Sequence, residues 1–246
     1  MTRLELLIPQ SLAAAAIIVL LAACTTPHPR LDPGGETYDG MVPVRDSGLR
    51  EAWVRPGIDI RSYRQVMLLP VEIQYRAVRD RGFTSLSRSD TTEFPLSDAD
   101  KQRLVDTVTE VFRDELSKGR SLALATQPGP DVLQAKVTLL DVVSRMPPEG
   151  PGRTDIYLDE IGAATPVLEL KDSMSGETLA RAVDRRKVDA PAGPGGPNTL
   201  SRVTPVTAWS EVRRVARRWA STVTQLIDQL HALGPLPAGS PKPAGS

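Results

Sequence analysis

Few residues in this sequence have side chains suited to covalent or metal chemistry. The chain contains a single cysteine, Cys24, and two histidines, His28 and His231. So few groups limit zinc chemistry. A serine–histidine–aspartate triad is disfavoured because His28 lies in a predicted tether and His231 at the end of a predicted helix, and no Gly-x-Ser-x-Gly turn or phosphate-binding glycine loop supports one. We therefore expect no catalytic residues, no metal site and no bound cofactor.

Cys24 follows an apolar run that ends in small residues. Residues 12–21 read LAAAAIIVLL, Arg3 lies ahead of them, and Ala22 and Ala23 precede the cysteine. A basic start, a short apolar core and small residues before the break are the parts of a secretory signal. The run is shorter than the roughly 20 residues of a membrane span. The alternatives are a signal peptide with a chance cysteine, or a cysteine buried in the fold.

The segment Leu21-Ala22-Ala23-Cys24 resembles the bacterial lipobox. The resemblance implies transfer of diacylglycerol to the Cys24 thiol, cleavage between Ala23 and Cys24, and acylation of the new amino terminus with palmitate or a similar chain. Several acyl chains would anchor the protein stably in a membrane, because two membrane signals already suffice. Thr25 stands where aspartate would imply inner-membrane retention, so the sorting rule implies the outer membrane, with the domain in the periplasm.

Acidic side chains in the second half of the chain could serve hydrolysis of peptidoglycan. Two carboxyl groups that face one cleft at a fixed separation can cleave a glycosidic bond. The alternative, which we favour, is that these side chains cap a turn or lie on a solvated strand face, because geometry must precede any catalytic role. The candidates are Asp155, Asp159, Glu160, Glu169 and Asp172.

Four arginines near the carboxyl terminus recur at helical spacing and could form a basic stripe. Such a stripe would contact an acidic surface, such as lipid head groups, lipopolysaccharide or peptidoglycan carboxylates. The alternative, again favoured, is a solvated helix face opposite an apolar seam that contains Trp209 and Trp219. The four are Arg213, Arg214, Arg217 and Arg218.

The composition limits both the core and the partners. Of the 246 residues, 40% are hydrophobic and only 4% aromatic, so the core must consist mainly of valine, leucine and alanine. The 30 basic and 30 acidic residues balance, so no global basic field supports nucleic-acid binding. With Cys24 lipidated, no cysteine is left for a disulfide, and stability must come from packing.

Two segments have helical periodicity. Ser97 followed by Asp100 predicts the start of the first helix, and Lys118-Gly119 predicts its end. The second helix is predicted over residues 207–233, with Gly234 as its stop. Its apolar seam comprises Trp209, Val212, Ala216, Trp219, Val223, Leu226, Leu230 and Leu233.

Alternation of polar and apolar residues predicts the strands. The turn from Asp172 to Glu177, with Ser and Gly between them, predicts a hairpin. Strands and helices in this order favour an α+β fold, a two-layer α/β sandwich in which two helices pack on one face of a mixed or mainly antiparallel sheet. The predicted strands are residues 66–75, 122–126, 132–145, 166–171 and 178–186.

The same patterns predict four regions along the chain. Residues 1–23 are the lipoprotein signal peptide, and residues 24–55, rich in Pro, Gly and charge, are the lipidated cysteine and a flexible tether. Residues 56–233 form a single globular domain, and residues 234–246 form a disordered tail.

Several segments resemble one bacterial family in the right order along the chain. Together with the lipobox, they make roughly residues 38–230 similar to the lipoprotein family called domain of unknown function 3313, which has no assigned chemistry and so implies no activity. The segments are Tyr63-Arg64-Gln65-Val66, Leu69-Pro70-Val71-Glu72, Gln127 to Leu133, Asp172-Ser173 with Gly176 to Ala180, Val183 to Arg186, Trp209, and Trp219-Ala220.

A weaker, fold-level similarity links three segments to envelope modules of the curli-secretion and Tol-B amino-terminal types. These are Leu69-Pro70, Asp131-Val132-Leu133 and the hairpin from Asp172 to Glu177. Such a similarity bears on fold more than on function.

These features together predict a non-enzymatic binding or scaffolding module of the bacterial envelope. Acyl chains would hold it to the outer membrane, and its partner would be an envelope protein or peptidoglycan. One alternative is a cell-wall hydrolase, or an activator of one, that uses the carboxylates above. Another is a self-associating ring or pore accessory. None of these features sets the oligomeric state.

Overall fold

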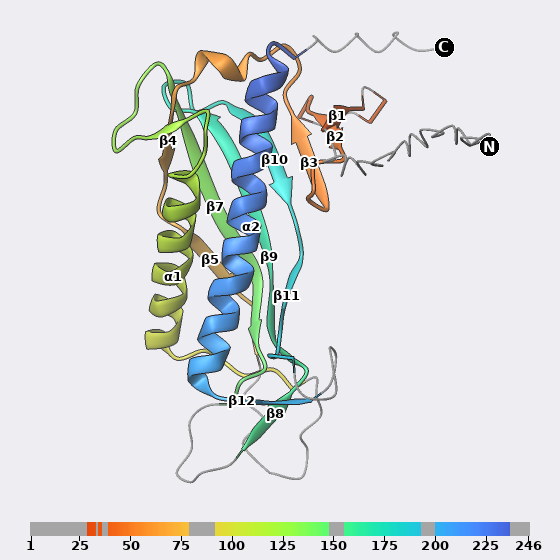
Figure 1. Cartoon of the computed structure of the whole chain (residues 1–246), viewed down its shortest axis with the longest axis vertical. Coiled ribbons are helices and arrows are strands. Elements are labelled where there is room, and N and C mark those ends of the chain that lie inside the picture. Colours follow the sequence, from red (N-terminus) through yellow and green to blue (C-terminus); the bar gives the residue numbers. More distant parts are fainter. Residues whose placement is uncertain are drawn as a thin grey trace, which may run out of the picture.

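The computed structural model consists of two layers (Figure 1). Two helices lie side by side on one face of a large sheet, and a separate two-stranded sheet lies at one end. The predicted α+β class, with a mainly antiparallel mixed sheet and both helices on one face, is confirmed. The described residues are 29–32, 34–35, 39–78, 92–147, 155–192 and 200–236.

Two long antiparallel strands, β7 (Val132–Ser144) and β9 (Glu160–Asp172), form the centre of the sheet. Strands β10 and β11 pair one after the other with the edge of β9 that faces away from β7. Strands β5 and β4 pair in the same way with the edge of β7 that faces away from β9. The remaining elements are β1 (Arg30–Leu31), β2 (Val42–Arg45), β3 (Glu51–Val54), the 3₁₀ turn η1 (Ile60–Ser62), β4 (Gln65–Leu68), β5 (Glu72–Tyr75), β6 (Ala123–Leu124), β8 (Ile156–Leu158), β10 (Thr178–Val183), β11 (Arg186–Asp189) and β12 (Ser201–Val203).

The order across the sheet is β1-β2-β3-β10-β9-β7-β4-β6. Strand β4 runs parallel to both of its neighbours, β5 also runs parallel to β7, and the other pairs are antiparallel. Strands β8 and β12 form the small sheet.

Both helices begin where side chains satisfy their first backbone N–H groups. Helix α1 (Asp98–Leu116) starts after Ser97, whose hydroxyl accepts from the Asp100 N–H at 3.1 Å, as predicted. Helix α2 (Pro205–Leu233) starts two residues earlier than predicted, because Thr204 and Thr207 form a reciprocal capping box. It ends at Gly234, whose φ of 77° suits glycine.

The core lies between the helices and the sheet. The apolar residues predicted on one face of β7, from Leu133 to Leu139, are buried beneath the helices. In α2, Trp219 and the apolar residues that follow it are buried, whereas Leu233, the last helical residue, is 50% exposed. The buried face of α1 comprises Leu104, Val108, Val111, Phe112 and Leu116.

Several predicted strands differ in extent from the observed ones. The strand predicted over residues 178–186 ends at Val183 as β10, and Arg186 begins β11. Strand β9 starts at Glu160 rather than at residue 166. Its first residues were not predicted as a strand because they are rich in glycine and alanine, which have low strand propensity. The strand predicted over residues 66–75 is interrupted at Leu69-Pro70, where proline has no N–H for the ladder. The Leu69 N–H still donates to the Ala135 carbonyl at 3.0 Å.

The region predicted as a tether, residues 24–55, is largely part of the domain. Strands β2 and β3 extend the sheet, and Met41 and Val54 are fully buried. At the other end, Leu236 is buried and its N–H donates to the Ile58 carbonyl at 2.9 Å, so the domain continues past residue 233. The signal peptide, Cys24 and residues 237–246 lie outside the described residues.

A bulge divides the central strand pair. The register of β7 and β9 shifts between Leu140 and Val143, and Asp141 adopts a positive φ of 54°. Beyond the bulge the two backbones approach so closely that a Cβ on Gly162 would lie 2.5 Å from the Val143 carbonyl oxygen. Only glycine fits there without a backbone shift.

We therefore expect Gly162→Ala to lower the free energy of unfolding by about 1–3 kcal/mol, the usual range for overpacking in a dense interior. Chemical denaturation monitored by circular dichroism measures this difference. Gly34→Ala is the matched control, because the nearest atom to its added Cβ, an Asp32 carboxylate oxygen, lies 3.5 Å away. Equal effects of the two substitutions would contradict the close approach.

Candidate functional site

The candidate carboxylates on the second half of β9 are held in polar contacts. Glu169 lies within 3.2 Å of Arg181 and 3.5 Å of Lys171. Asp172 accepts from the Ser175 N–H at 2.6 Å and from the Tyr63 hydroxyl at 2.9 Å. These hydrogen bonds hold the pKa of Asp172 below its usual range, and the bond from the Ser175 N–H has the largest effect. The carboxylate of Asp172 therefore stabilises the hairpin turn.

The other candidate carboxylates lie at the opposite end of the strand. Asp155 pairs with Arg202 at 2.8 Å, and buried Glu160 pairs with Arg145 at 3.0 Å and Lys187 at 2.9 Å. Asp159 is exposed. Twelve strand residues, about 40 Å, separate Glu160 from Asp172, whereas glycosidase carboxyl groups lie roughly 5–10 Å apart. The structure does not bring the five together at one site.

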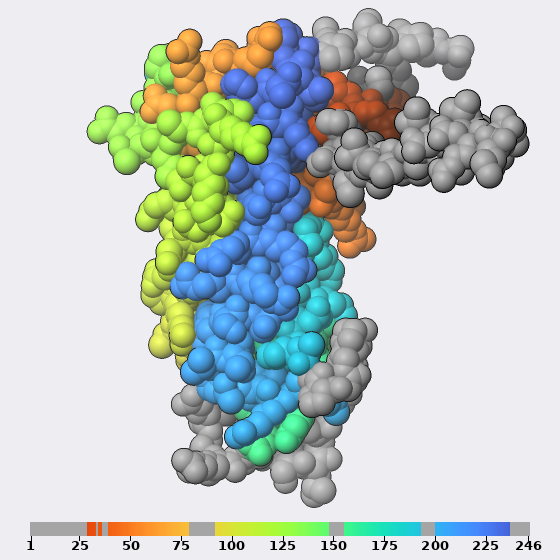
Figure 2. Space-filling view, in the orientation of Figure 1, coloured from red at the N-terminus to blue at the C-terminus, as the bar shows by residue number. Residues whose placement is uncertain are grey.

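Helix α2 forms a blue ridge on the face shown in Figure 2. Of its four candidate arginines, Arg213 is half-buried and the other three are exposed. Arg213 pairs with Glu110 of α1 at 3.0 Å, and Arg217 approaches Glu115 of α1 to 3.6 Å. Arg214 pairs with Glu211 in the same helix, and Arg218 is exposed. Three of the four charges are thus balanced by neighbouring acids, two of them across the helix–helix contact, which weakens any basic field.

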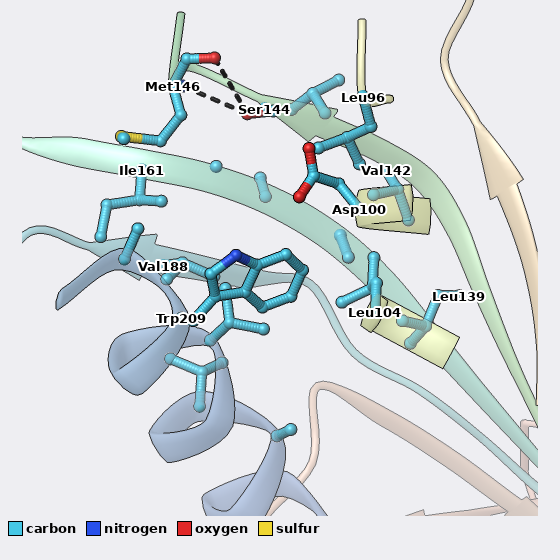
Figure 3. Close-up of a pocket in the computed structure, with 18 of the residues that line it drawn as sticks. Leu96, Asp100, Leu104, Leu139, Val142, Ser144, Met146, Ile161, Val188 and Trp209 are labelled. Atoms are coloured by element: carbon cyan, nitrogen blue, oxygen red, sulfur yellow. Dashed lines mark hydrogen bonds between the residues drawn. The ribbon is translucent and has the colours of Figure 1, made fainter. Parts of the chain in front are cut away.

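A cavity of about 490 Å³, hereafter the helix–sheet cavity, lies among the described residues. It lies beneath the first half of α2 and most of α1. Its floor is formed by the end of β7, the start of β9, and β11. In Figure 3, Leu96, Val142, Ile161 and Trp209 surround the open space from different elements. Its lining is mainly aliphatic and aromatic.

Small side chains explain why this region stays open. On β9 the run Gly162-Ala163-Ala164 forms part of the cavity floor, and Ala208 and Ala216 of α2 face it. Protein interiors are otherwise packed with few voids larger than a water molecule. The other half of the sheet carries leucine and valine beneath the helices and leaves no comparable space.

A few polar groups also line the helix–sheet cavity. Asp100 extends toward it in Figure 3 and accepts from the Ser97 hydroxyl at 2.7 Å, and the Ser144 hydroxyl bonds to the Met146 backbone. In contrast, the Trp219 indole N–H is buried without a hydrogen-bond partner among the described residues. An apolar pocket with a few polar groups is typical of a small-molecule binding site.

None of the candidate residues from sequence analysis lines this cavity. Trp209 and Trp219, which we interpreted as core packing, do line it. Trp219 is also core, since it packs edge-on against Phe112 with ring centroids 4.8 Å apart. The only sequence feature that could have indicated the cavity is the run of glycine and alanine on β9. A run of small residues predicts a cavity only once the elements that cover it are known.

A model of the family described as "Protein of unknown function (DUF3313)" matches residues 33–223. The chain belongs to this family. The resemblance seen in the sequence is thereby confirmed, and the DUF3313 description assigns no activity. No curated protein matches the chain.

Solved structures similar to this DUF3313 chain are distant. The PelC dodecamer from Paraburkholderia phytofirmans has 10% identity over 70% of this chain and 96% of its own, with a TM-score of 0.33. XCC0632 from Xanthomonas campestris, of family DUF330, has 10% identity over 72% and 90%, with a TM-score of 0.37. A candidate lipoprotein from Caulobacter crescentus CB15 has 10% identity over 71% and 91%, with a TM-score of 0.29. Likenesses at this level carry no argument about function.

Across the described ranges, neither helix of the DUF3313 protein is long and apolar enough to cross a membrane. Those same ranges contain no group of three or more histidine, cysteine, aspartate or glutamate residues placed to hold a metal ion.

The most strongly shifted carboxyl pKa belongs to Asp141, at the bulge beside the cavity floor. Arg76 donates to both of its oxygens, at 2.6 and 2.5 Å, and Arg185 lies 3.3 Å away. The Arg76 hydrogen bonds lower the pKa of Asp141 to about 2. Arg76 also pairs with Glu93, so one guanidinium joins the bulge to the segment that precedes α1.

We expect this ion pair to stabilise the fold in a pH-dependent way. Because the folded pKa lies below the unfolded value of about 4, the contribution is present above pH 4 and is lost as the pH falls toward 2. Asp141→Asn removes the charge while asparagine tolerates the positive φ. Urea unfolding should show the variant to be less stable at neutral pH, with a gap that narrows between pH 4 and 2. A gap independent of pH would exclude the ionic contribution.

Proposed function

We propose that this DUF3313 protein is an outer-membrane lipoprotein whose periplasmic domain binds an apolar ligand in the helix–sheet cavity and catalyses no reaction. The cavity carries this proposal. Its volume of about 490 Å³ lies within the roughly 300–1,000 Å³ of ligand pockets. Burial of apolar surface from water supplies the affinity, since each buried CH₂ group contributes about 0.8 kcal/mol.

The lipobox supports a lipid anchor at Cys24, and the fold supports one orientation of the domain relative to the membrane. Only Thr25 to His28 separate Cys24 from Pro29, and an extended chain covers at most about 18 Å over that distance. Strand β1 follows Pro29 and lies near the end of the molecule where α2 ends (Figure 1). The cavity lies beneath the opposite half of this helix, which is about 43 Å long. Anchoring at Cys24 would therefore hold the cavity away from the outer membrane and toward the periplasm.

The arrangement of charges supports a binding role over hydrolysis. Of the carboxylates considered for cleavage of peptidoglycan, none lines the cavity. Glu160, Glu169 and Asp172 are engaged by cations or turn N–H groups. A general acid needs a raised pKa, whereas the pKa of Asp172 is lowered.

Filling the cavity should abolish binding without unfolding the protein. Ala216→Phe adds a ring to a residue that lines the open space, and we expect it to weaken binding of an apolar fluorescent dye by at least about tenfold. Ala232→Phe is the matched control, because it adds the same ring to an exposed position of the same helix. Fluorescence titration and thermal unfolding of the chain from residue 25 onward measure both effects. Equal dye affinity in the two variants would contradict the proposal.

Removal of the thiol should abolish the anchor. Wild-type protein in Gram-negative cells is expected to carry lipid mass on the amino terminus and to fractionate with the outer membrane. Cys24→Ser is expected to lose the lipid mass and to leave that fraction. Intact mass spectrometry and membrane fractionation check both points. Identical mass and fractionation of the two proteins would refute the lipid anchor but not the cavity.

A further inference from the structure

We infer that the ligand is a single unbranched acyl chain whose carbonyl oxygen accepts hydrogen bonds from the Trp219 indole N–H and the Arg186 Nε–H. This inference rests on the proposed function and specifies the chemistry of the ligand. Its basis is the shape of the helix–sheet cavity together with two buried donors that lack partners.

The cavity is elongated along the helices. Its lining on α2 runs from Pro205 to Trp219, and its lining on the side of α1 runs from Ser97 to Phe112. Each of these stretches is about 21–23 Å long at 1.5 Å per residue. One extended acyl chain can lie along this lining, in contact with aliphatic and aromatic side chains of both helices.

Two donors at one end of the cavity have no hydrogen-bond partner among the described residues. One is the Nε1 of Trp219, whose side chain is only 2% exposed, and the other is the buried Nε of Arg186. Both side chains line the cavity. A buried donor left unpaired costs roughly 1–3 kcal/mol, and native proteins rarely leave one without a reason. A ligand oxygen at this position would satisfy both donors.

The backbone places these donors at the same end. Trp219 is the last residue of α2 that lines the cavity, and Arg186 pairs in register with Ala164, close to Pro166 at the end of the β9 lining. The opposite end carries the Asp100 carboxylate, which would repel an anionic head group. The acyl chain therefore runs from the Trp219 end toward the first turn of α2.

The charge at the donor end suits a carbonyl group. Arg186 contacts Asp184 at 2.6 Å, so its positive charge is already balanced. A neutral carbonyl can accept from the free Nε–H without disturbing this pair. The accepting oxygen could belong to the neutral carbonyl of an acyl ester or to the charged carboxylate of a free fatty acid, and the experiment uses one probe for each.

The test compares dodecane, dodecanoate and monododecanoylglycerol as competitors of the apolar dye, in wild type and in Trp219→Phe. The substitution removes the indole N–H, and we expect it to weaken both acyl probes about fivefold, the value of one net hydrogen bond, while dodecane changes less than about twofold. The acyl probe that binds wild type more tightly identifies the source as free acid or ester.

Trp209→Phe is the matched control, because Trp209 also lines the cavity but is only partly buried. It should affect alkane and acyl probes equally. As a readout that needs no variant at position 219, the Trp219 indole N–H resonance of ¹⁵N-labelled protein should shift with the acyl probes and not with dodecane.

The outcomes separate the inference from the proposed function. Equal weakening of alkane and acyl probes by Trp219→Phe, or equal indole shifts with both, would overturn the carbonyl assignment while the cavity remains a binding site. If no probe displaces the dye and no indole resonance moves, the proposed function fails and the inference fails with it.

Discussion

The antiparallel pairing of β7 with β9 is the constraint on which the rest of this structure depends. Each strand has 13 residues, and the other strands of the large sheet extend outward from these two. The bulge at Asp141 divides the pair into two halves with different roles. In one half, leucine and valine fill the space beneath the helices. In the other, Gly162 and its alanine neighbours leave the helix–sheet cavity.

Side-chain size therefore divides the sheet into a densely packed half and a half that carries the cavity. Dense packing between α2 and the strands around Leu133 and Leu168 supplies most of the apolar burial. The same helix continues over the cavity, where Trp219 belongs to both regions. Because the packed half holds both helices in place, the other half can stay open without loss of the fold.

Charge plays a supporting role throughout the domain. The outer face of the sheet, the hairpin turn and the contact between α1 and α2 each use paired acids and bases, as at Arg181–Glu169 and Arg213–Glu110. Exposed pairs of this kind contribute little stability, about 0–1 kcal/mol each. They also occupy the groups that hydrolysis or a basic docking surface would require. The helix–sheet cavity, which lacks such pairs along most of its lining, is where we propose that a ligand binds.

The sequence by itself determined the elements whose signals are local. The cap at Ser97, the alternation along β7, the turn at Asp172 and the seam of α2 were all predicted, because capping, periodicity and turn chemistry involve only neighbouring residues. The family was also recognisable from ordered segments. The lipobox at Cys24 is equally local, and it stays a prediction.

Only the tertiary structure decided the features that depend on residues far apart in the chain. Strands β2 and β3 lie in a segment rich in Pro, Gly and charge. They join the sheet because β3 pairs with β10 and β2 pairs with β3, and the first part of β9 is a strand because β7 lies beside it. The partners of Arg213 and Arg217 lie about a hundred residues away in the sequence, on α1. The helix–sheet cavity depends on five elements meeting around small side chains, and no local pattern encodes an empty volume.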